Sequence, residues 1–181
     1  HIYVDGAELQ NFEVQEIRKA VVYVSQEDFL FTASVRENLK MGNEEISDEE
    51  MIEISRKMGV HQFVSKMERA YDSVLEERGK NLSKGQRQKL SLTRAILRHP
   101  KILILDEATS NMDSISEREI LNYIKGIRDI TLILISHRIN VIADSDCIYV
   151  LQKGNIVARG TDKQLKEQCK LYRQLYGEEE K

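Results

Sequence analysis

The stretch Lys101–Thr109 reads KILILDEAT, in which four consecutive apolar residues precede two adjacent carboxylates, Asp106 and Glu107. A short apolar run of this kind is typical of a strand that is buried on both faces of a parallel sheet. Ligands of open parallel sheets bind beyond the carboxyl ends of the strands. Asp106 and Glu107 are therefore candidates for a functional site at that edge, and two acids that only cap a loop are the alternative.

The two carboxylates are expected to have different tasks. Successive residues of a strand point to opposite faces of the sheet, so Asp106 and Glu107 would not point the same way. One carboxylate at such an edge can hold Mg²⁺ through water, while the other polarises a nucleophile.

Three more apolar runs predict buried strands: Val21–Val24, Thr131–Ile135 and Ile148–Leu151. Helical stretches alternate with them, which indicates an α/β protein with a mostly parallel sheet covered by helices. The last run is also the first half of a terminal hairpin, because a turn at residues 152–155 follows it. Gly154 would supply the unusual dihedral angles of that turn.

The composition indicates one globular domain. The chain has 181 residues, of which 41% are hydrophobic, so it is long and apolar enough to form a core. Its formal net charge of −3 argues against a nucleic-acid partner, which requires a basic surface. The longest apolar runs are far shorter than the roughly 18 residues that span a bilayer.

Five segments fit the capping box that begins many helices, in which Ser or Thr is followed three residues later by Glu or Gln. They begin at Ser34, Ser47, Ser83, Ser114 and Thr161. The helix that starts near Ser83 is expected to end before Pro100, because the residue preceding a proline is disfavoured in the helical region.

Three further segments carry candidate ligands. Ser83–Gln86 contains Gly85, which permits close approach of a ligand to the backbone, and the start of a helix offers free N–H groups to an anion. An ordinary helix start is the alternative at this position. His137 follows the run 131–135, and Gln26 follows the run 21–24, so both are expected at the same sheet edge as Asp106.

In their order and spacing these segments resemble the nucleotide-binding domain of ABC transporters, of the exporter type. Residues 29–38 and 71–79 also resemble exporter segments. The correspondences are Gln26 with the Q-loop, Ser83–Gln86 with the signature motif, Ile102–Glu107 with the Walker B strand, Ser110–Asp113 with the D-loop and His137 with the switch histidine.

The resemblance implies a P-loop NTPase-like, mostly parallel sheet with an inserted helical subdomain at about residues 34–98. Residues 1–33 and 99–181 would form the catalytic core. ATP and Mg²⁺ would be the cofactors. Asp106 would hold Mg²⁺ through water, Gln26 would sense it, Glu107 would be the general base, and His137 would contact the γ-phosphate and help to order Glu107.

The resemblance also implies partners. Two such domains would sandwich two ATP molecules, so that Ser83, Gly85 and Gln86 bind the nucleotide of the other domain and Asp113 crosses the dimer interface. Gln26 would couple the domain to the transmembrane domain of the transporter, at the cytoplasmic face of the cell membrane. The second ATPase domain could be identical or different, and no nucleic acid is implied.

Two departures from the family pattern stand out. The phosphate loop, GxxxxGK[ST], does not occur, since the one Gly-Lys pair, Gly79-Lys80, is followed by Asn81. We therefore expect the chain to be a piece that starts after the phosphate-loop helix and that is inactive alone. The signature motif usually has two glycines, and Lys84 replaces the first of them.

These departures keep other interpretations open. A non-catalytic interaction module could complete the ATP site of a partner through its signature helix. An ABC protein unconnected with transport is a third interpretation, which the exporter-like segment at residues 77–79 disfavours. A DEAD-box helicase would share the Asp-Glu-Ala strand end, but it would lack Ser83–Gln86 and would be more basic.

Overall fold

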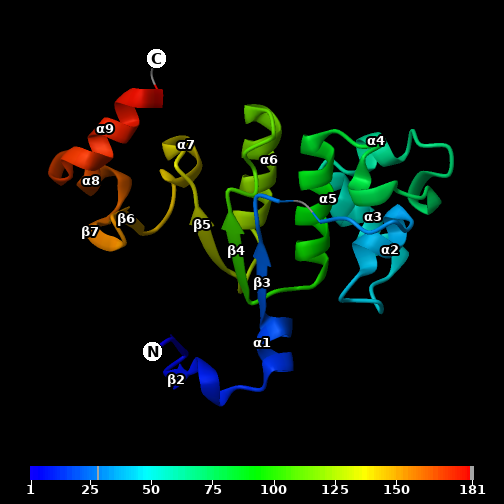
Figure 1. Cartoon of the computed structure of the whole chain (residues 1–181), viewed down its shortest axis with the longest axis horizontal. Coiled ribbons are helices and arrows are strands. Elements are labelled where there is room, and N and C mark those ends of the chain that lie inside the picture. The colour runs from blue at the N-terminus through cyan, green and yellow to red at the C-terminus, as the bar shows by residue number, and fades with distance from the viewer. Residues whose placement is uncertain (28, 180–181) are drawn as a thin grey trace. The chain divides into compact units, whose positions relative to one another are not determined.

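The computed structural model describes residues 1–27 and 29–179 of the chain. It divides into two compact units, residues 1–133 and residues 134–181. Helices and strands alternate along the first unit, which confirms the predicted α/β class (Figure 1).

The central sheet consists of three strands in the order β3-β4-β5. They are β3 (Val21–Val24), β4 (Ile102–Asp106) and β5 (Thr131–Ile135), at the positions that the sequence predicts. β3 and β4 are parallel, with Val24 paired to Leu105, so their carboxyl ends lie at one edge of the sheet. That shared edge is where ligands of such sheets bind.

Burial differs between these strands. In β4 the side chains of Leu103 and Leu105 are almost fully buried, as predicted. The prediction of a buried strand is wrong for β5, since Ile133 is 44% exposed and Ile135 is 48% exposed. The side chains of a strand point alternately to the two faces of a sheet, so the exposure of alternate residues in β5 means that, among the described residues, little packs against the face to which Ile133 and Ile135 point.

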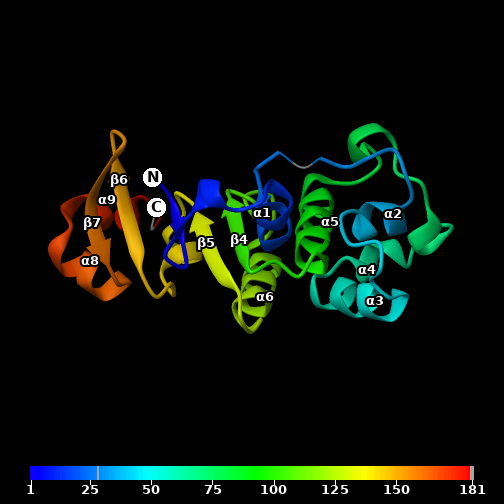
Figure 2. The same cartoon turned by 90° about the horizontal axis from the view of Figure 1, so that it is seen from below.

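The segment between β3 and β4 is helical. It comprises α2 (Val35–Lys40), α3 (Asp48–Lys57), α4 (His61–Val64), the 3₁₀ turns η2 (Ala70–Asp72) and η3 (Glu77–Gly79), and α5 (Lys84–Leu97). Figures 1 and 2 both show α5 between the sheet and helices α2–α4. Fully buried side chains such as Leu39, Met51 and Leu90 form its core. The subdomain bounds of about 34–98 stay a prediction.

The helix starts confirm the capping boxes of Ser34, Ser83 and Thr161 in full. Ser47 accepts the hydrogen bond from the Glu50 N–H, which is the serine half of the box. The box predicted at Ser114 is wrong, because Ser114 is already the first helical residue of α6 (Ser114–Lys125). The preceding residue, Asp113, is the N-cap of α6 instead.

The predicted end of the helix before Pro100 is confirmed. α5 ends at Leu97, and His99 has a φ of 50°, outside the right-handed helical region. A proline at the next position disfavours helical dihedral angles at His99.

The start of the chain forms a small antiparallel ribbon, β1 (Tyr3–Val4) and β2 (Ala7–Glu8). A 3₁₀ turn, η1 (Leu9–Asn11), and helix α1 (Val14–Ala20) connect this ribbon to β3.

The second unit contains the predicted terminal hairpin. Its elements are α7 (Ile139–Ile142), β6 (Ile148–Gln152), β7 (Asn155–Gly160), α8 (Asp162–Gln168) and α9 (Lys170–Glu179). β6 and β7 are antiparallel, with Gln152 paired to Asn155, so Lys153 and Gly154 form a two-residue turn. Alternate residues of β6, Ile148 and Val150, pack with α8 and α9, while Tyr149 and Leu151 are exposed. The prediction of a buried strand is therefore wrong for one face of β6.

Across the residues that the structure describes, none of the helices is both long and apolar enough to cross a bilayer.

Candidate functional site

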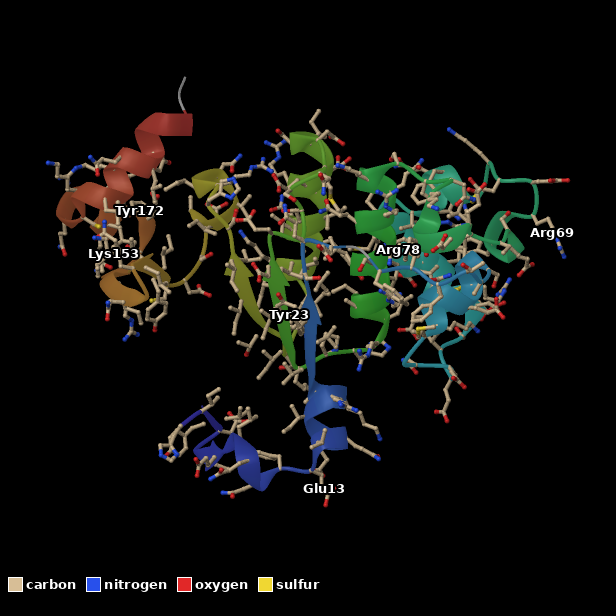
Figure 3. All side chains as sticks on the ribbon, viewed as in Figure 1. Glu13, Tyr23, Arg69, Arg78, Lys153 and Tyr172 are labelled. Atoms are coloured by element: carbon tan, nitrogen blue, oxygen red, sulfur yellow. The ribbon has the colours of Figure 1, made fainter. Side chains whose placement is uncertain are left out.

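Asp106 is the last residue of β4 and is half-buried. Its Oδ2 accepts a hydrogen bond of 2.8 Å from the hydroxyl of Tyr23, which stands on the neighbouring strand β3 (Figure 3). This bond, helped by partial desolvation and by the negative charge of Asp106, raises the pKa of Tyr23 above its ordinary value. Asp106 is thus held in place at the sheet edge by a neutral donor.

Glu107 follows directly but has left the strand. Its φ is 52°, in the left-handed region that residues other than glycine rarely adopt. The expectation that strand alternation points Asp106 and Glu107 to opposite faces therefore does not apply to Glu107. Its carbonyl accepts a 3.2 Å hydrogen bond from the Ser110 N–H, which turns the chain sharply after the strand. Residues with such unusual backbone dihedral angles are frequent at functional sites.

Gln26 lies two residues beyond β3 and is exposed. Because Val24 pairs with Leu105 in a parallel register, Gln26 and Asp106, the last residue of β4, lie at the same edge of the sheet. Carboxylate and amide oxygens are ligands that Mg²⁺ accepts, together with water and phosphate oxygens. These two side chains therefore fit a Mg²⁺ site by the chemistry of their donors. Larger clusters of His, Cys, Asp and Glu suited to a metal are absent from the described part of the chain.

The start of α5 has the geometry of an anion site. The Ser83 Oγ accepts from the Gln86 N–H at 3.2 Å, and the Gln86 Oε1 accepts from the Ser83 N–H at 2.8 Å. A Cβ atom on Gly85 would lie 3.0 Å from the Asn111 carbonyl oxygen, which is tighter than ordinary packing. A larger residue here would thus require the Asn111 backbone to shift by a few tenths of an ångström, because two backbone segments approach each other closely.

A pocket of about 550 Å³ opens beside this helix start. Three segments line it: residues 59–66 in and around α4, the start of α5, and the loop before α6. The residues are Gly59, Gln62, Phe63, Lys66, Ser83, Lys84, Gly85, Gln86, Lys89, Asn111, Met112 and Asp113. Sequence-distant elements therefore converge on one cavity.

The charges around this pocket favour an anion. Three lysines line it, Lys66, Lys84 and Lys89, against a single carboxylate, Asp113. The N-terminal end of α5 adds the positive end of its helix dipole. The hydrogen bond from the Ser116 N–H, with the side chain of Ser116 and the charge of Lys89 as smaller causes, lowers the pKa of Asp113.

The predicted residues thus form two groups. Ser83, Gly85, Gln86 and Asp113 line the pocket. Asp106, Glu107 and Gln26 lie at the carboxyl edge of β3 and β4. His137 follows β5 by two residues and belongs to the second unit, and its contact with Glu107 stays a prediction.

Sequence reasoning missed Tyr23 and Gln88. Tyr23 pairs with Ile104 in the register of β3 and β4, so it lies diagonally from Asp106, two residues on. A tyrosine in an otherwise aliphatic run was the available signal. Gln88, a fully buried glutamine on α5, bonds the loop after β4. No local pattern distinguishes it from the other polar residues of this helix.

The chain belongs to the ABC transporter family, because the model of that family matches residues 1–110, more than half of the chain. It is 42% identical to the heterocyst differentiation ATP-binding protein HepA of Nostoc over 92% of the chain and 28% of that protein. It is 39% identical to the leptomycin B resistance protein pmd1 of Schizosaccharomyces pombe over 98% of the chain and 13% of that protein.

A solved structure is similar over almost the whole chain. It is a bacterial Atm1-family ABC exporter with ATP bound, with a TM-score of 0.93, 29% identity, and coverage of 98% of this chain and 31% of that one. The chain therefore spans less than a third of the length of each of these relatives. The family and the fold that the sequence motifs indicated are both confirmed.

Proposed function

We propose that residues 1–181 are part of an ATP-hydrolysing domain that powers export by an ABC transporter. The observation that carries this proposal is the likeness, over 98% of the chain, to an ABC exporter with ATP bound. The carboxylate edge of β4 and the capped start of α5 supply the two kinds of site that such an activity needs.

The sheet edge would hold the nucleotide of the chain's own domain. Asp106, oriented by Tyr23, and Gln26 would hold Mg²⁺ together with water and phosphate oxygens. Bound there, Mg²⁺ would offset the negative charge of the phosphates.

Glu107 would accept the proton of the attacking water, as the general base. Its left-handed backbone directs the side chain differently from that of a strand residue, so the two adjacent carboxylates can serve different tasks. His137 would donate to the γ-phosphate and help to keep Glu107 in place.

The pocket at α5 would bind the phosphates of a second domain's ATP. The hydroxyl of Ser83 acts as the acceptor in the capping box, so its own hydrogen can donate to a phosphate oxygen. Gly85 lets the phosphate approach the backbone N–H groups of the first turn, and Gln86 keeps that turn rigid. Asp113, at the rim of the same pocket, would meet the second domain.

This assignment implies partners outside the 181 residues. A phosphate loop would have to come from another part of the polypeptide, because GxxxxGK[ST] does not occur in residues 1–181. The second ATPase domain, identical or different, would complete two sites. A transmembrane domain, coupled through Gln26, would place the assembly at the cytoplasmic face of the membrane.

The decisive experiment is the substitution Glu107→Gln in the intact polypeptide that contains these residues. It preserves the shape of the side chain and removes the base, so ATP hydrolysis should fall by roughly 10²-fold or more while ATP binding persists. Turnover and equilibrium binding of ATP measure the two effects.

Glu119→Gln is the matched control, because Glu119 is an exposed glutamate on α6. This variant should hydrolyse ATP at the wild-type rate. Near-wild-type turnover in Glu107→Gln would remove Glu107 from the catalytic role.

A second candidate function is a non-catalytic module that completes a partner's ATP site. The pocket at Ser83 and the lack of a phosphate-loop motif in these residues favour it. In that case Ser83→Arg, which fills the pocket entrance, would abolish hydrolysis by the assembly, whereas Glu107→Gln would leave it unchanged.

A further inference from the structure

Gln88 connects α5 to the 107–113 loop, the segment between β4 and α6. Its side chain is 0% exposed, and its Oε1 accepts a 3.0 Å hydrogen bond from the Asn111 backbone N–H. Its Nε2 lies 3.5 Å from the Ser110 Oγ, a long and weaker contact. Gly85 lies three residues earlier on the same face of the helix, packed against the Asn111 carbonyl.

The 107–113 loop is itself a chain of short backbone bonds. The Ser110 N–H donates to the Glu107 carbonyl at 3.2 Å, and the Met112 N–H donates to the Thr109 carbonyl at 3.1 Å. At its far end Asp113 caps α6. Residues 110 and 111 are therefore connected, by hydrogen bonds and by the backbone, to Glu107 on one side and to the Asp113 cap on the other.

We propose that Gln88 is a positioning residue that ties the start of α5 to the loop of Glu107, so that an anion bound at Ser83–Gly85 adjusts Glu107. The inference rests on the proposed function, because a coupling between the start of α5 and Glu107 is useful only if both act on ATP. The signature pocket would face a second domain's nucleotide, and Glu107 would act on the chain's own. One buried amide then links the occupancy of one ATP site to the geometry of the base in the other.

A glutamine suits this position because its side-chain amide carries both a hydrogen-bond acceptor and a hydrogen-bond donor. The amide oxygen accepts from a backbone N–H while the amide nitrogen faces a hydroxyl, and helix and loop are thereby fixed in two directions. Methionine has a similar length and volume but forms neither bond. Gln88→Met should therefore keep the packing and release the loop.

The first measurement is hydrogen exchange on the intact polypeptide, followed in the peptide that covers residues 107–113. Loss of the Gln88 acceptor should speed the exchange of the Asn111 amide roughly threefold or more. Unchanged exchange in Gln88→Met would overturn the tether, whatever the enzyme activity.

The second measurement is steady-state ATP hydrolysis by the same variant. Displacing a catalytic group by about 1 Å costs up to roughly 10²-fold in rate. We expect kcat to fall roughly tenfold and KM for ATP to stay within about twofold, because Gln88 contacts the loop and no nucleotide.

Thr93→Val is the matched control. Thr93 is a buried polar residue on the same helix, 0% exposed, whose Oγ1 donates to the Lys89 carbonyl at 2.7 Å, a hydrogen bond within α5 itself. This variant loses a buried hydrogen bond and should keep the wild-type kcat. Equal losses of kcat in Thr93→Val and Gln88→Met, or a wild-type kcat in Gln88→Met, would overturn the positioning role.

The two proposals fail in different ways. If the wild type shows no hydrolysis that depends on Glu107, the proposed function fails, and the exchange measurement alone decides the tether. If Glu107→Gln abolishes hydrolysis while Gln88→Met exchanges and turns over like the wild type, only the positioning role fails.

Discussion

At position 113 a carboxylate oxygen accepts a 2.9 Å hydrogen bond from the Ser116 N–H and thereby caps α6. The same residue lines the lysine-rich pocket. Capping requires the ionised form as the better acceptor, and this is the cause of the lowered pKa of Asp113. The negative charge of Asp113 thus caps α6 and is also the charge that it would present to a second domain.

The cap predicts a pH dependence of stability. Since the pKa of Asp113 is lower in the folded chain than its ordinary value of 3.8, the stabilisation is complete above that value. It is lost as the pH falls through the lower, folded value. Asp113→Ala should reduce the unfolding temperature by a few degrees at neutral pH, with a smaller difference at low pH.

Thermal unfolding of residues 1–181, followed by circular dichroism at several pH values, measures this difference. Asp113→Asn is the control, because asparagine also caps helices but does not titrate in this range. A destabilisation by Asp113→Ala that is equally large at low and neutral pH would contradict the assignment.

Among the elements, the β6–β7 hairpin shows how a turn sets a register. Lys153, which is labelled in Figure 3, and Gly154 form the turn. Their φ values of 49° and 79° are the left-handed pair of a type I′ turn. Gly154 adopts this conformation without strain, whereas Lys153, at the tip of the hairpin, does so at a cost. Asparagine is the residue that type I′ turns favour at the first of these two positions.

Lys153→Asn should therefore stabilise the second unit by up to about 1 kcal/mol, because asparagine adopts the left-handed region at a lower cost than lysine. Denaturant unfolding of residues 1–181 gives the free energy of unfolding for the comparison. Lys163→Asn, the same change at an exposed position of α8, has no left-handed dihedral to relieve and should not stabilise. A stabilisation of equal size in both variants would show that charge, and not the turn, is responsible.

At the scale of the whole chain, β5 ends the described sheet with exposed isoleucines. An exposed apolar edge strand invites pairing with another chain. We expect residues 1–181 to associate with themselves in a concentration-dependent way, as measured by light scattering. Ile133→Lys places a charge on the edge strand and should reduce this association.

Ile115→Lys is the control for that experiment, because Ile115 is an exposed isoleucine in the first turn of α6. It introduces the same charge away from the edge strand. If it suppresses association as strongly as Ile133→Lys, or if the wild type is a monomer at every concentration, the edge strand is not the cause.

The affinity for nucleotide is also a property of the whole domain, because it depends on segments that lie far apart in the sequence. A phosphate loop supplies several N–H groups and a lysine, and five hydrogen bonds to charged groups amount to about 7–15 kcal/mol. A micromolar dissociation constant corresponds to about 8 kcal/mol in total. We therefore expect residues 1–181 alone to bind Mg·ATP with a dissociation constant weaker than about 10 μM. Isothermal titration calorimetry measures it, and tighter binding would contradict the expectation.

The sequence by itself determined the features that depend on neighbouring residues. The apolar run before Asp106 defined β4, the Ser83-x-x-Gln86 spacing defined the start of α5, and Gly154 marked the hairpin turn. These follow from local rules of side-chain alternation, capping and backbone freedom, which act within a few residues. The spacing of the motifs also sufficed to indicate the family.

Only the tertiary structure decided what depends on residues far apart in the chain. The exposure of Ile133 depends on what packs against its face of the sheet, and the bond from Tyr23 to Asp106 follows from the register of β3 and β4. The link between Gln88 and Asn111 exists because α5 packs against the 107–113 loop. Strand order, register and packing minimise the free energy of the whole chain, so no local pattern contains them.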